Sequence, residues 1–318
     1  RLGEAQVAVA DSCGGFKAMP RMAADVLRLF KGCENVIMMP ANRGLRFFAP
    51  LFLTYNKFYR RRIHYIVIGG WLDTFLESHK WLVGLLKKFD AIYVESETMK
   101  TALCERGFDN AVVMHNFKKL KSLSENELEY PDGEPYKLCT FSRVMKEKGI
   151  EDAIDAVKTV NSRLGRTVYT LDIFGQVDKD YEERFSELKK TFPDFIRCGG
   201  AIAADRSTET LKSYFALLFP TYYRGEGFAG TLIDAMSAGV PVIASDWKYN
   251  SEFVVPGRTG VIIKNCNSEK LAKVLADIAD DPEKWNSMRL SALREAEKYS
   301  PEKASRPLID RINGRDCL

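Results

Sequence analysis

The sequence lacks the features that would assign it to a membrane, metal-binding or disulfide-stabilised class. Its 318 residues contain no apolar run of about 18 residues, the length needed to cross a bilayer. The seven cysteines are odd in number and scattered, and no CxxC pair suggests zinc or a redox centre. The start, RLGEAQVAVADS, has neither a signal-peptide pattern nor an initiator Met. We therefore expect a soluble cytoplasmic protein with free thiols.

An excess of charge of one sign is also missing. Forty-seven Lys and Arg residues against 43 Asp and Glu give a net charge of only +4, which argues against a nucleic-acid partner. The three histidines, His64, His79 and His115, belong to no discernible Ser/His/Asp or Cys/His set, so we expect packing or surface roles for them. A hydrophobic content of 46% over 318 residues is ample for two packed domains.

The sequence does contain a repeated alternation of short apolar runs and longer amphipathic segments. This alternation is typical of βα units that build a parallel sheet. A polar, proline-containing segment at residues 118–135 interrupts it. We therefore predict a first domain over residues 1–120, a linker over residues 121–135, and a second domain over residues 136–300. Residues 301–318 are expected to run back toward the first domain.

Residues 217–245, LLFPTYYRGEGFAGTLIDAMSAGVPVIAS, carry the strongest local signal. An apolar strand stops at Pro220, a glycine-rich loop surrounds Glu226, and an apolar helix follows before the next strand. The backbone N–H groups at the start of this helix would suit a diphosphate. The carboxylates of Glu226 and Asp234 are suited to accept hydrogen bonds from sugar hydroxyls. A nucleotide sugar offers both kinds of group.

Two cations stand at a second strand-to-helix junction. Arg143 and Lys148, in SRVMKEKG, follow an apolar strand and precede a helix. This position lies at the carboxyl edge of the predicted sheet, where doubly wound proteins bind ligands. An Arg fork and a Lys point charge there could neutralise a diphosphate leaving group. Solvated cations near a helix start would show the same pattern.

Two segments of the first domain allow alternative interpretations. Residues 43–62, which begin at Arg43 and end at Arg62, interleave aromatic residues with cations. They could form a helix that contacts anionic lipid, or an ordinary crossover helix that packs on a sheet. Gly69, Gly70 and Trp71 follow an apolar strand, where the backbone could approach a ligand closely or simply make a tight turn.

Taken together, Arg143, Lys148, Glu226 and Asp234 resemble the donor site of retaining glycosyltransferases of family four. The resemblance covers most of the chain and is strongest over residues 137–264. The family's arginine and lysine-glycine segment is similar to FSRVMKEKGIEDAIDAV, and the end of its next strand is similar to FG at Phe174-Gly175. Its E-x7-E segment is similar to EGFAGTLIDAMSAGVPVIAS.

The resemblance implies the α/β GT-B fold, with two Rossmann-like parallel-sheet domains that face a cleft. The chain begins at what looks like the second strand of the first sheet, so we expect that domain to lack its first strand and glycine loop, as in a truncated product. Many family members place a histidine near Gly69, Gly70 and Trp71, which are therefore candidates for the acceptor side.

The family's donor site implies a role for each matching residue. Glu226 contacts the transferred sugar, and Arg143 with Lys148 stabilises the departing negative charge. Gly230 and Thr231 offer backbone donors to the phosphates. Phe228 and Gly175 also belong to the expected donor-binding residues.

Asp234 departs from the family pattern, which has a longer Glu to hold the ribose hydroxyls. Asp is one methylene shorter, so either the helix sits closer to the nucleotide or a water intervenes. Asp178-Lys179-Asp180 has the acid spacing of metal-dependent glycosyltransferases of another fold, but here it better fits a helix start.

The resulting prediction is a glycosyltransferase that retains anomeric configuration and moves a sugar from a nucleotide sugar to a glycan, lipid-linked or small-molecule acceptor. We expect no cofactor, since the nucleotide sugar counts as a co-substrate, and no metal. The protein would be cytoplasmic, or peripheral at the inner face of the membrane. The alternatives are a catalytically inactive nucleotide-sugar-binding scaffold and, on the same architecture, a nucleotide-sugar epimerase.

Overall fold

The chain folds into two compact units. The structure, a computed structural model, describes residues 7–10 and 19–315. The first unit combines Arg1–Met114 with Arg306–Leu318, and the second is His115–Ser305. The chain therefore returns to the first unit at its end, and residues 121–135 belong to the second unit.

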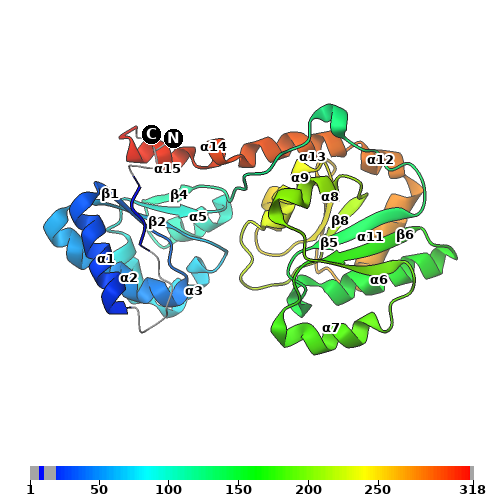
Figure 1. Cartoon of the computed structure of the whole chain (residues 1–318), viewed down its shortest axis with the longest axis horizontal. Coiled ribbons are helices and arrows are strands. Elements are labelled where there is room, and N and C mark those ends of the chain that lie inside the picture. Colours follow the sequence, from blue (N-terminus) through cyan, green and yellow to red (C-terminus); the bar gives the residue numbers. More distant parts are fainter. Residues whose placement is uncertain (1–6, 11–18, 316–318) are drawn as a thin grey trace. The chain divides into compact units, whose positions relative to one another are not determined.

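The first unit is built around a four-stranded parallel sheet in the order β1-β2-β3-β4 (Figure 1). Its elements are α1 (Met19–Gly32), β1 (Asn35–Met38), α2 (Asn42–Tyr59), β2 (Arg62–Ile66), α3 (Leu72–Ser78), α4 (Lys80–Leu86), β3 (Ala91–Val94), α5 (Glu97–Glu105), β4 (Ala111–Val113) and α15 (Arg306–Ile312). Residues 7–10 form no helix or strand. The expected loss of a first strand and glycine loop concerns residues partly outside the described ranges and stays a prediction.

Helix α2 covers most of the segment that could have been a lipid-binding helix. Its buried residues are Leu45, Ala49 and Phe52, and Phe52 meets Phe30 of α1 edge to face at 5.3 Å between ring centroids. The apolar stripe therefore packs inside the unit, as in a crossover helix between parallel strands. No helix within residues 7–10 and 19–315 is both long and apolar enough to span a membrane.

The second unit contains a six-stranded parallel sheet in the order β10-β9-β8-β5-β6-β7. Its strands are β5 (Tyr136–Phe141), β6 (Tyr169–Phe174), β7 (Ile196–Gly200), β8 (Ala216–Phe219), β9 (Val242–Ser245) and β10 (Gly260–Ile263). Strands β8 and β9 are buried along their whole length, which explains their continuous apolar sequences. The α/β fold with two parallel sheets confirms the predicted fold class.

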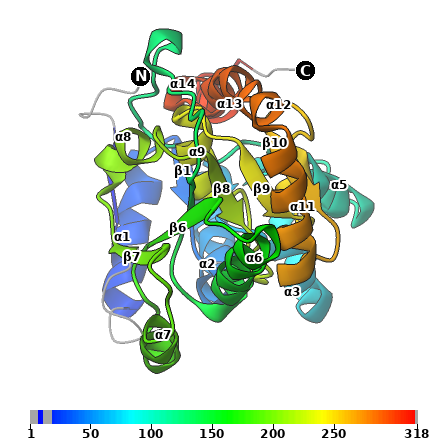
Figure 2. The ribbon, with the colours of Figure 1, turned by 90° about the vertical axis from the view of Figure 1, so that its right-hand side faces the viewer.

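Helices cover both faces of this sheet. They are α6 (Ile150–Leu164), α7 (Glu182–Lys189), α8 (Ser207–Leu211), α9 (Gly230–Ser237), α10 (Asn250–Phe253), α11 (Ser268–Asp280), α12 (Pro282–Asn286), α13 (Arg289–Ala296) and α14 (Pro301–Ala304). Figure 2 shows α6 and α11 side by side, and these two helices contact each other. Val157 of α6 and Leu275 of α11 belong to the same buried core cluster.

Five short 3-10 helices complete the second unit: η3 (Glu125–Glu127), η4 (Lys146–Lys148), η5 (Lys179–Tyr181), η6 (Ala204–Arg206) and η7 (Glu297–Tyr299). Helix η3 carries a complete capping box between Ser124 and Glu127. Arg294 of α13 also pairs with Glu125 at 2.8 Å. The polar segment before β5 is therefore an ordered part of this unit.

Two glycines bound helix α6, and they differ in the space around them. Gly149 precedes the helix at φ +70° and Gly165 follows it at φ +67°. A Cβ added to Gly149 would lie 2.3 Å from the Pro220 carbonyl oxygen, whereas nothing lies within 4 Å of a Cβ on Gly165. Gly149 thus permits close contact between the chain after β5 and the chain after β8.

We expect Gly149→Ala to destabilise the second unit more than Gly165→Ala. Both alanines would be strained by about 1–2 kcal/mol in the left-handed region. At position 149 the forced shift of a neighbouring backbone adds about 1–3 kcal/mol. Urea unfolding of the two variants measures this difference, and equal losses would contradict the close contact.

Candidate functional site

The order of strands in the second unit creates one crevice at the carboxyl edge of the sheet. Chain order reverses between the neighbouring strands β5 and β8, because β6 and β7 lie on one side of this pair and β9 and β10 on the other. Open α/β sheets bind ligands at such a switch point. A cavity of about 320 Å³ opens there, lined in part by Lys118, Lys148, Glu226 and Asp234 together with the first turn of α9.

Lys148 and Glu226 form a buried ion pair in this cavity. Lys148 Nζ lies 2.6 Å from Glu226 Oε2, and the two residues are 9% and 6% exposed. The ammonium also lies over the rings of Phe219 and Tyr223, at 5.4 and 5.3 Å from their centroids. Attraction to a carboxylate and two aromatic faces keeps this cation in a site with little water.

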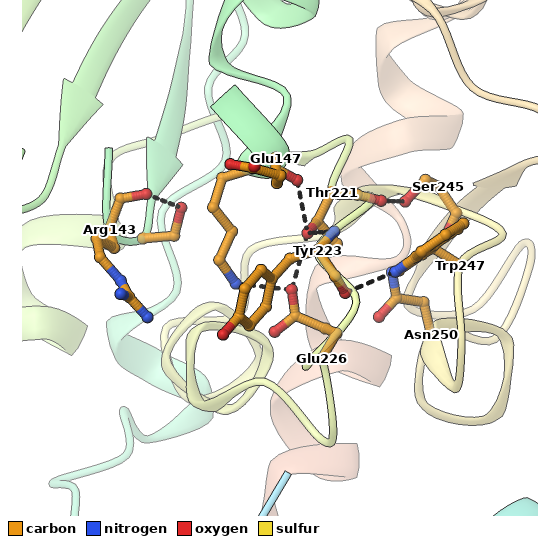
Figure 3. A network of polar contacts seen from close by, with 10 residues as sticks. Arg143, Glu147, Thr221, Tyr223, Glu226, Ser245, Trp247 and Asn250 are labelled. Atoms are coloured by element: carbon orange, nitrogen blue, oxygen red, sulfur yellow. Dashed lines mark hydrogen bonds and ion pairs between the residues drawn. The ribbon is translucent and has the colours of Figure 1, made fainter. Parts of the chain in front are cut away.

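A polar network fixes the loop that carries Glu226 (Figure 3). The Thr221 hydroxyl lies 2.8 Å from Glu226 Oε2 and 3.2 Å from the Glu147 carbonyl oxygen. Ser245 donates to the Thr221 carbonyl, and the Trp247 indole donates to the Tyr223 carbonyl at 2.7 Å. The loop after β8 is therefore tied both to η4 and to the chain after β9.

Arg143 lies at the margin of the same network. Its side chain is 52% exposed, and its guanidinium lies 3.3 Å from Asp178 Oδ2 and 5.9 Å from the centre of the Tyr223 ring. Asp178 also caps η5 by accepting a hydrogen bond from the Asp180 backbone at 3.2 Å. The Asp178-Lys179-Asp180 segment thus starts a helix, as expected.

Asp234 has protein partners on both carboxylate oxygens. Oδ2 lies 2.5 Å from Lys118 Nζ, and Oδ1 accepts a hydrogen bond from the Ser207 hydroxyl at 2.8 Å. Only 1% of Asp234 is exposed. For the shorter Asp side chain we considered a closer helix or an intervening water. Neither possibility predicts the contacts of the carboxylate with Lys118 and Ser207.

The first turn of α9 offers donors beside these charges. Ala229 precedes the helix and provides no side-chain cap. Within the described residues, the buried Thr231 hydroxyl has no hydrogen-bond partner, although Thr231 is only 9% exposed. An uncapped helix start with a spare hydroxyl is suited to an anion.

Two of the expected donor-binding residues have clear structural roles outside the cavity lining. Phe228 stacks on Phe253 with ring centroids 3.7 Å apart, inside an aromatic cluster that includes Tyr299. At Gly175, with φ +140°, a Cβ would lie 1.8 Å from the Ser142 carbonyl oxygen. Gly175 thus allows the ends of β5 and β6 to approach each other.

The expected acceptor-side residues lie in the first unit, just after β2. The Gly69 backbone, at φ +85°, donates to Glu95 Oε1 at 3.2 Å. The Trp71 indole donates to the Ile68 carbonyl at 2.8 Å, and its ring meets Phe75 edge to face. These contacts stabilise a turn at the carboxyl end of the strand.

Sequence reasoning missed Lys118, Ser207, Thr221 and Tyr223. Lys118 begins the polar stretch of residues 118–135, which has no hydrophobic period, and Ser207 begins a five-residue helix that carries no motif. The one signal in the sequence that could have indicated these residues is Asp234, because an acid shorter than the family's Glu needs different partners. Among the residues that the structure describes, no cluster of three or more His, Cys, Asp or Glu residues could hold a metal ion.

The fold and the site together define an α/β protein with a Rossmann-type strand order and a cavity lined by charged residues at the switch point. The family model described as "Glycosyl transferases group 1" matches residues 125–294, just over half of the chain. The chain therefore belongs to this family of glycosyltransferases, which confirms the resemblance found in the sequence.

Curated relatives are similar over part of their length. The chain is 28% identical over 183 residues to the poly(glycerol-phosphate) alpha-glucosyltransferase of Bacillus subtilis, covering 57% of this chain and 26% of that protein. It is 27% identical over 201 residues to the GtfA subunit of the UDP-N-acetylglucosamine–peptide N-acetylglucosaminyltransferase of Streptococcus parasanguinis, covering 61% and 38%. The chain thus spans well under half the length of these two relatives.

Solved structures support the fold. Anabaena HepE in complex with UDP matches with a TM-score of 0.75 at 16% identity, over 92% of this chain and 82% of that chain. Sucrose-phosphate synthase from Thermosynechococcus elongatus matches with a TM-score of 0.72 at 15% identity, over 95% and 82%. At these identities the likeness establishes the GT-B architecture.

We expect Lys148→Met to destabilise the protein by about 3–5 kcal/mol, because it leaves the Glu226 carboxylate buried without its cation. The double variant K148M/E226Q removes both charges and should recover part of this loss. Urea unfolding of the single and double variants tests the pair.

Lys190→Met is the matched control for this comparison. Lys190 also lies 2.6 Å from a carboxylate, that of Glu187, but the two side chains are 68% and 60% exposed. Its loss should not change stability measurably. A K148M variant as stable as this control would show that burial does not strengthen the Lys148–Glu226 pair.

Proposed function

We propose that this chain transfers a sugar from a nucleotide sugar to an acceptor hydroxyl with retention of anomeric configuration. The observation that carries the proposal is the convergence of Lys148, Glu226 and the start of α9 on one cavity at the switch point. A nucleotide sugar has a diphosphate for the cations and the helix start, and hydroxyls for the carboxylate.

The proposed roles follow from charge and position. The diphosphate lies against the Gly230 and Thr231 end of α9, and Lys148 offers it an ammonium. Arg143, at the margin, adds a second cation once it turns from Asp178 toward the ligand. Glu226 accepts hydrogen bonds from the transferred sugar with Oε1, since Lys148 and Thr221 contact Oε2. Phe228 and Gly175 then support this donor site from behind the lining.

The proposed reaction breaks the bond between the anomeric carbon and the phosphate oxygen. The acceptor oxygen forms its bond to that carbon on the same face of the sugar, and its proton passes to the departing phosphate. Stabilisation of negative charge on the leaving group supplies most of the rate. Lys148, held in the cavity, and Arg143, once it has turned toward the ligand, could provide it as cations of the protein, which supports our proposal of a metal-independent enzyme.

The names of similar proteins guide the choice of substrates. Anabaena HepE was solved with UDP-glucose, and the pneumococcal O-GlcNAc transferase GtfA with UDP and GlcNAc. A UDP-sugar is therefore the first donor to test. The acceptor is proposed to be a glycan, a lipid-linked sugar or a small molecule, shaped in part by Gly69, Gly70 and Trp71 of the first unit.

We expect the protein to release UDP from UDP-sugars when an acceptor is present. Glu226→Gln should lower the turnover by about 100-fold or more, because it removes the charge that orders both the sugar and Lys148. Arg143→Ala should chiefly weaken UDP binding, by about 10- to 100-fold. Coupled detection of released UDP gives kcat and KM, and calorimetry gives the UDP affinity.

Lys146→Ala is the control, since Lys146 is an exposed cation of the same segment. It should leave turnover and UDP affinity unchanged. Binding without turnover or acceptor labelling would instead indicate a scaffold, and interconversion of free donor would indicate an epimerase. Unchanged kinetics in both E226Q and R143A would contradict the site.

Peripheral membrane contact through residues 43–62 is a separate proposal. Although the apolar stripe of α2 packs inside the first unit, Phe58 remains 79% exposed beside the exposed Lys57 and Arg60. An aromatic side chain among cations is suited to an anionic lipid surface.

We expect the protein to sediment with phosphatidylglycerol vesicles and to be released by high salt. Phe58→Ser should weaken this binding, whereas Tyr130→Ser, which removes an exposed aromatic side chain of the second unit, should not. Equal sedimentation with neutral and anionic vesicles, or none with either, would contradict the proposal.

A further inference from the structure

A second lysine, Lys118, lines the same cavity as the Lys148–Glu226 pair. Lys118 Nζ lies 2.5 Å from Asp234 Oδ2, while the Ser207 hydroxyl donates to Oδ1 at 2.8 Å. The two partners differ sharply in access to solvent, because the Lys118 side chain is 33% exposed and that of Asp234 only 1%. Of the two groups, the ammonium is therefore the more accessible to a ligand.

The Lys118 ammonium lies beside the first turn of α9. A Cβ at Gly230 would lie 2.8 Å from Lys118 Cε and 3.3 Å from its Nζ. Thr231, whose buried hydroxyl has no partner among the described residues, belongs to the same turn and lines the same cavity. An ammonium carries three donor hydrogens, so the bond to Asp234 leaves others for a ligand.

The chain on both sides of Lys118 is fixed to the α9 region. Asn116 donates from its side-chain amide to the Phe228 carbonyl at 2.9 Å. The Leu123 backbone donates to the Ser237 carbonyl at 3.1 Å. Lys118 is thus held in place by its own segment as well as by Asp234, unlike a flexible surface lysine.

We propose that Lys118 is a ligand-binding cation for the phosphate end of a nucleoside diphosphate, and that Asp234 is the residue that positions it. The proposal rests on the proposed function and changes the role expected for Asp234. A carboxylate that is 1% exposed, with a partner on each oxygen, offers little to the hydroxyls of a ribose. Its negative charge instead holds an ammonium beside the helix start.

The rival explanation is that Lys118 only neutralises Asp234. The two explanations differ once both charges of the pair are removed. If Lys118 binds phosphate, its loss weakens the binding of every ligand that carries the diphosphate, whether or not Asp234 keeps its charge. If it only neutralises Asp234, K118M weakens pyrophosphate binding through the uncompensated carboxylate, and the double variant K118M/D234N binds pyrophosphate as tightly as the wild type.

The test is calorimetric binding of UDP, GDP, ADP and inorganic pyrophosphate to the whole chain. We expect Lys118→Met to weaken the binding of pyrophosphate, and of whichever nucleoside diphosphate the wild type binds, by about 10- to 100-fold each. This is the range of about 10- to 100-fold for one charge-assisted hydrogen bond. Lys118→Arg should retain most of the affinity. The control Lys119→Met removes the exposed neighbouring cation, which does not line the cavity, and should stay within about twofold of the wild type.

The double variant K118M/D234N keeps the test decisive even where K118M folds poorly, because it removes both charges of the pair. If Asp234 acts through Lys118, the double variant binds no more weakly than K118M, and D234N weakens nucleoside diphosphate and pyrophosphate alike. If Asp234 contacts the ribose directly, D234N weakens the nucleoside diphosphate alone, and the proposal is wrong.

The outcome for the wild type separates this inference from the proposed function. A wild-type protein that binds none of the three nucleoside diphosphates contradicts both. If the wild type binds a nucleoside diphosphate, and K118M or the double variant binds it equally well, only the role of Lys118 is contradicted.

Discussion

The buried pair of Lys148 and Glu226 is the interaction on which the site depends. Neither charge would remain at less than 10% exposure alone, because the desolvation of an isolated ion exceeds what packing can offset. The two residues therefore hold together the chains that follow β5 and β8. Gly149 permits that approach, since its missing side chain leaves room for the Pro220 carbonyl. Electrostatics and sterics thus favour one arrangement of the two loops.

The strand order explains why these loops meet at all. Strands β5 and β8 are neighbours in the sheet although β6 and β7 separate them in sequence. The chain after β9 reaches the same edge, where Ser245 and Trp247 bind the carbonyls of the loop that contains Glu226. The site is therefore supported by β5, β8 and β9, three adjacent strands of the sheet. A rigid sheet suits a centre that must hold charges in fixed positions.

The sequence predicted what depends on local pattern. The strand, proline, glycine loop and helix of residues 217–245 are recognisable because each signal lies within a few residues of the next. Contacts such as Lys118 with Asp234, 116 residues apart, depend on how separate segments pack and leave no periodicity to detect. For the same reason, the sequence did not reveal the structural roles of Phe228 and Gly175. These roles depend on an aromatic stack and on a close backbone approach, respectively.

The two ion pairs also explain how one cavity could serve a ligand with unlike ends. Lys148 with Glu226 and Lys118 with Asp234 place two ammonium groups and two carboxylates around the first turn of α9, so these four charges sum to zero. In the proposed complex, a diphosphate would add negative charge at the helix start, and both ammonium groups would turn part of their donors toward it. Each carboxylate would keep its lysine oriented before the phosphate arrives, so little reorganisation would accompany binding. Removing either acid would therefore affect the phosphate end, even though a carboxylate repels phosphate.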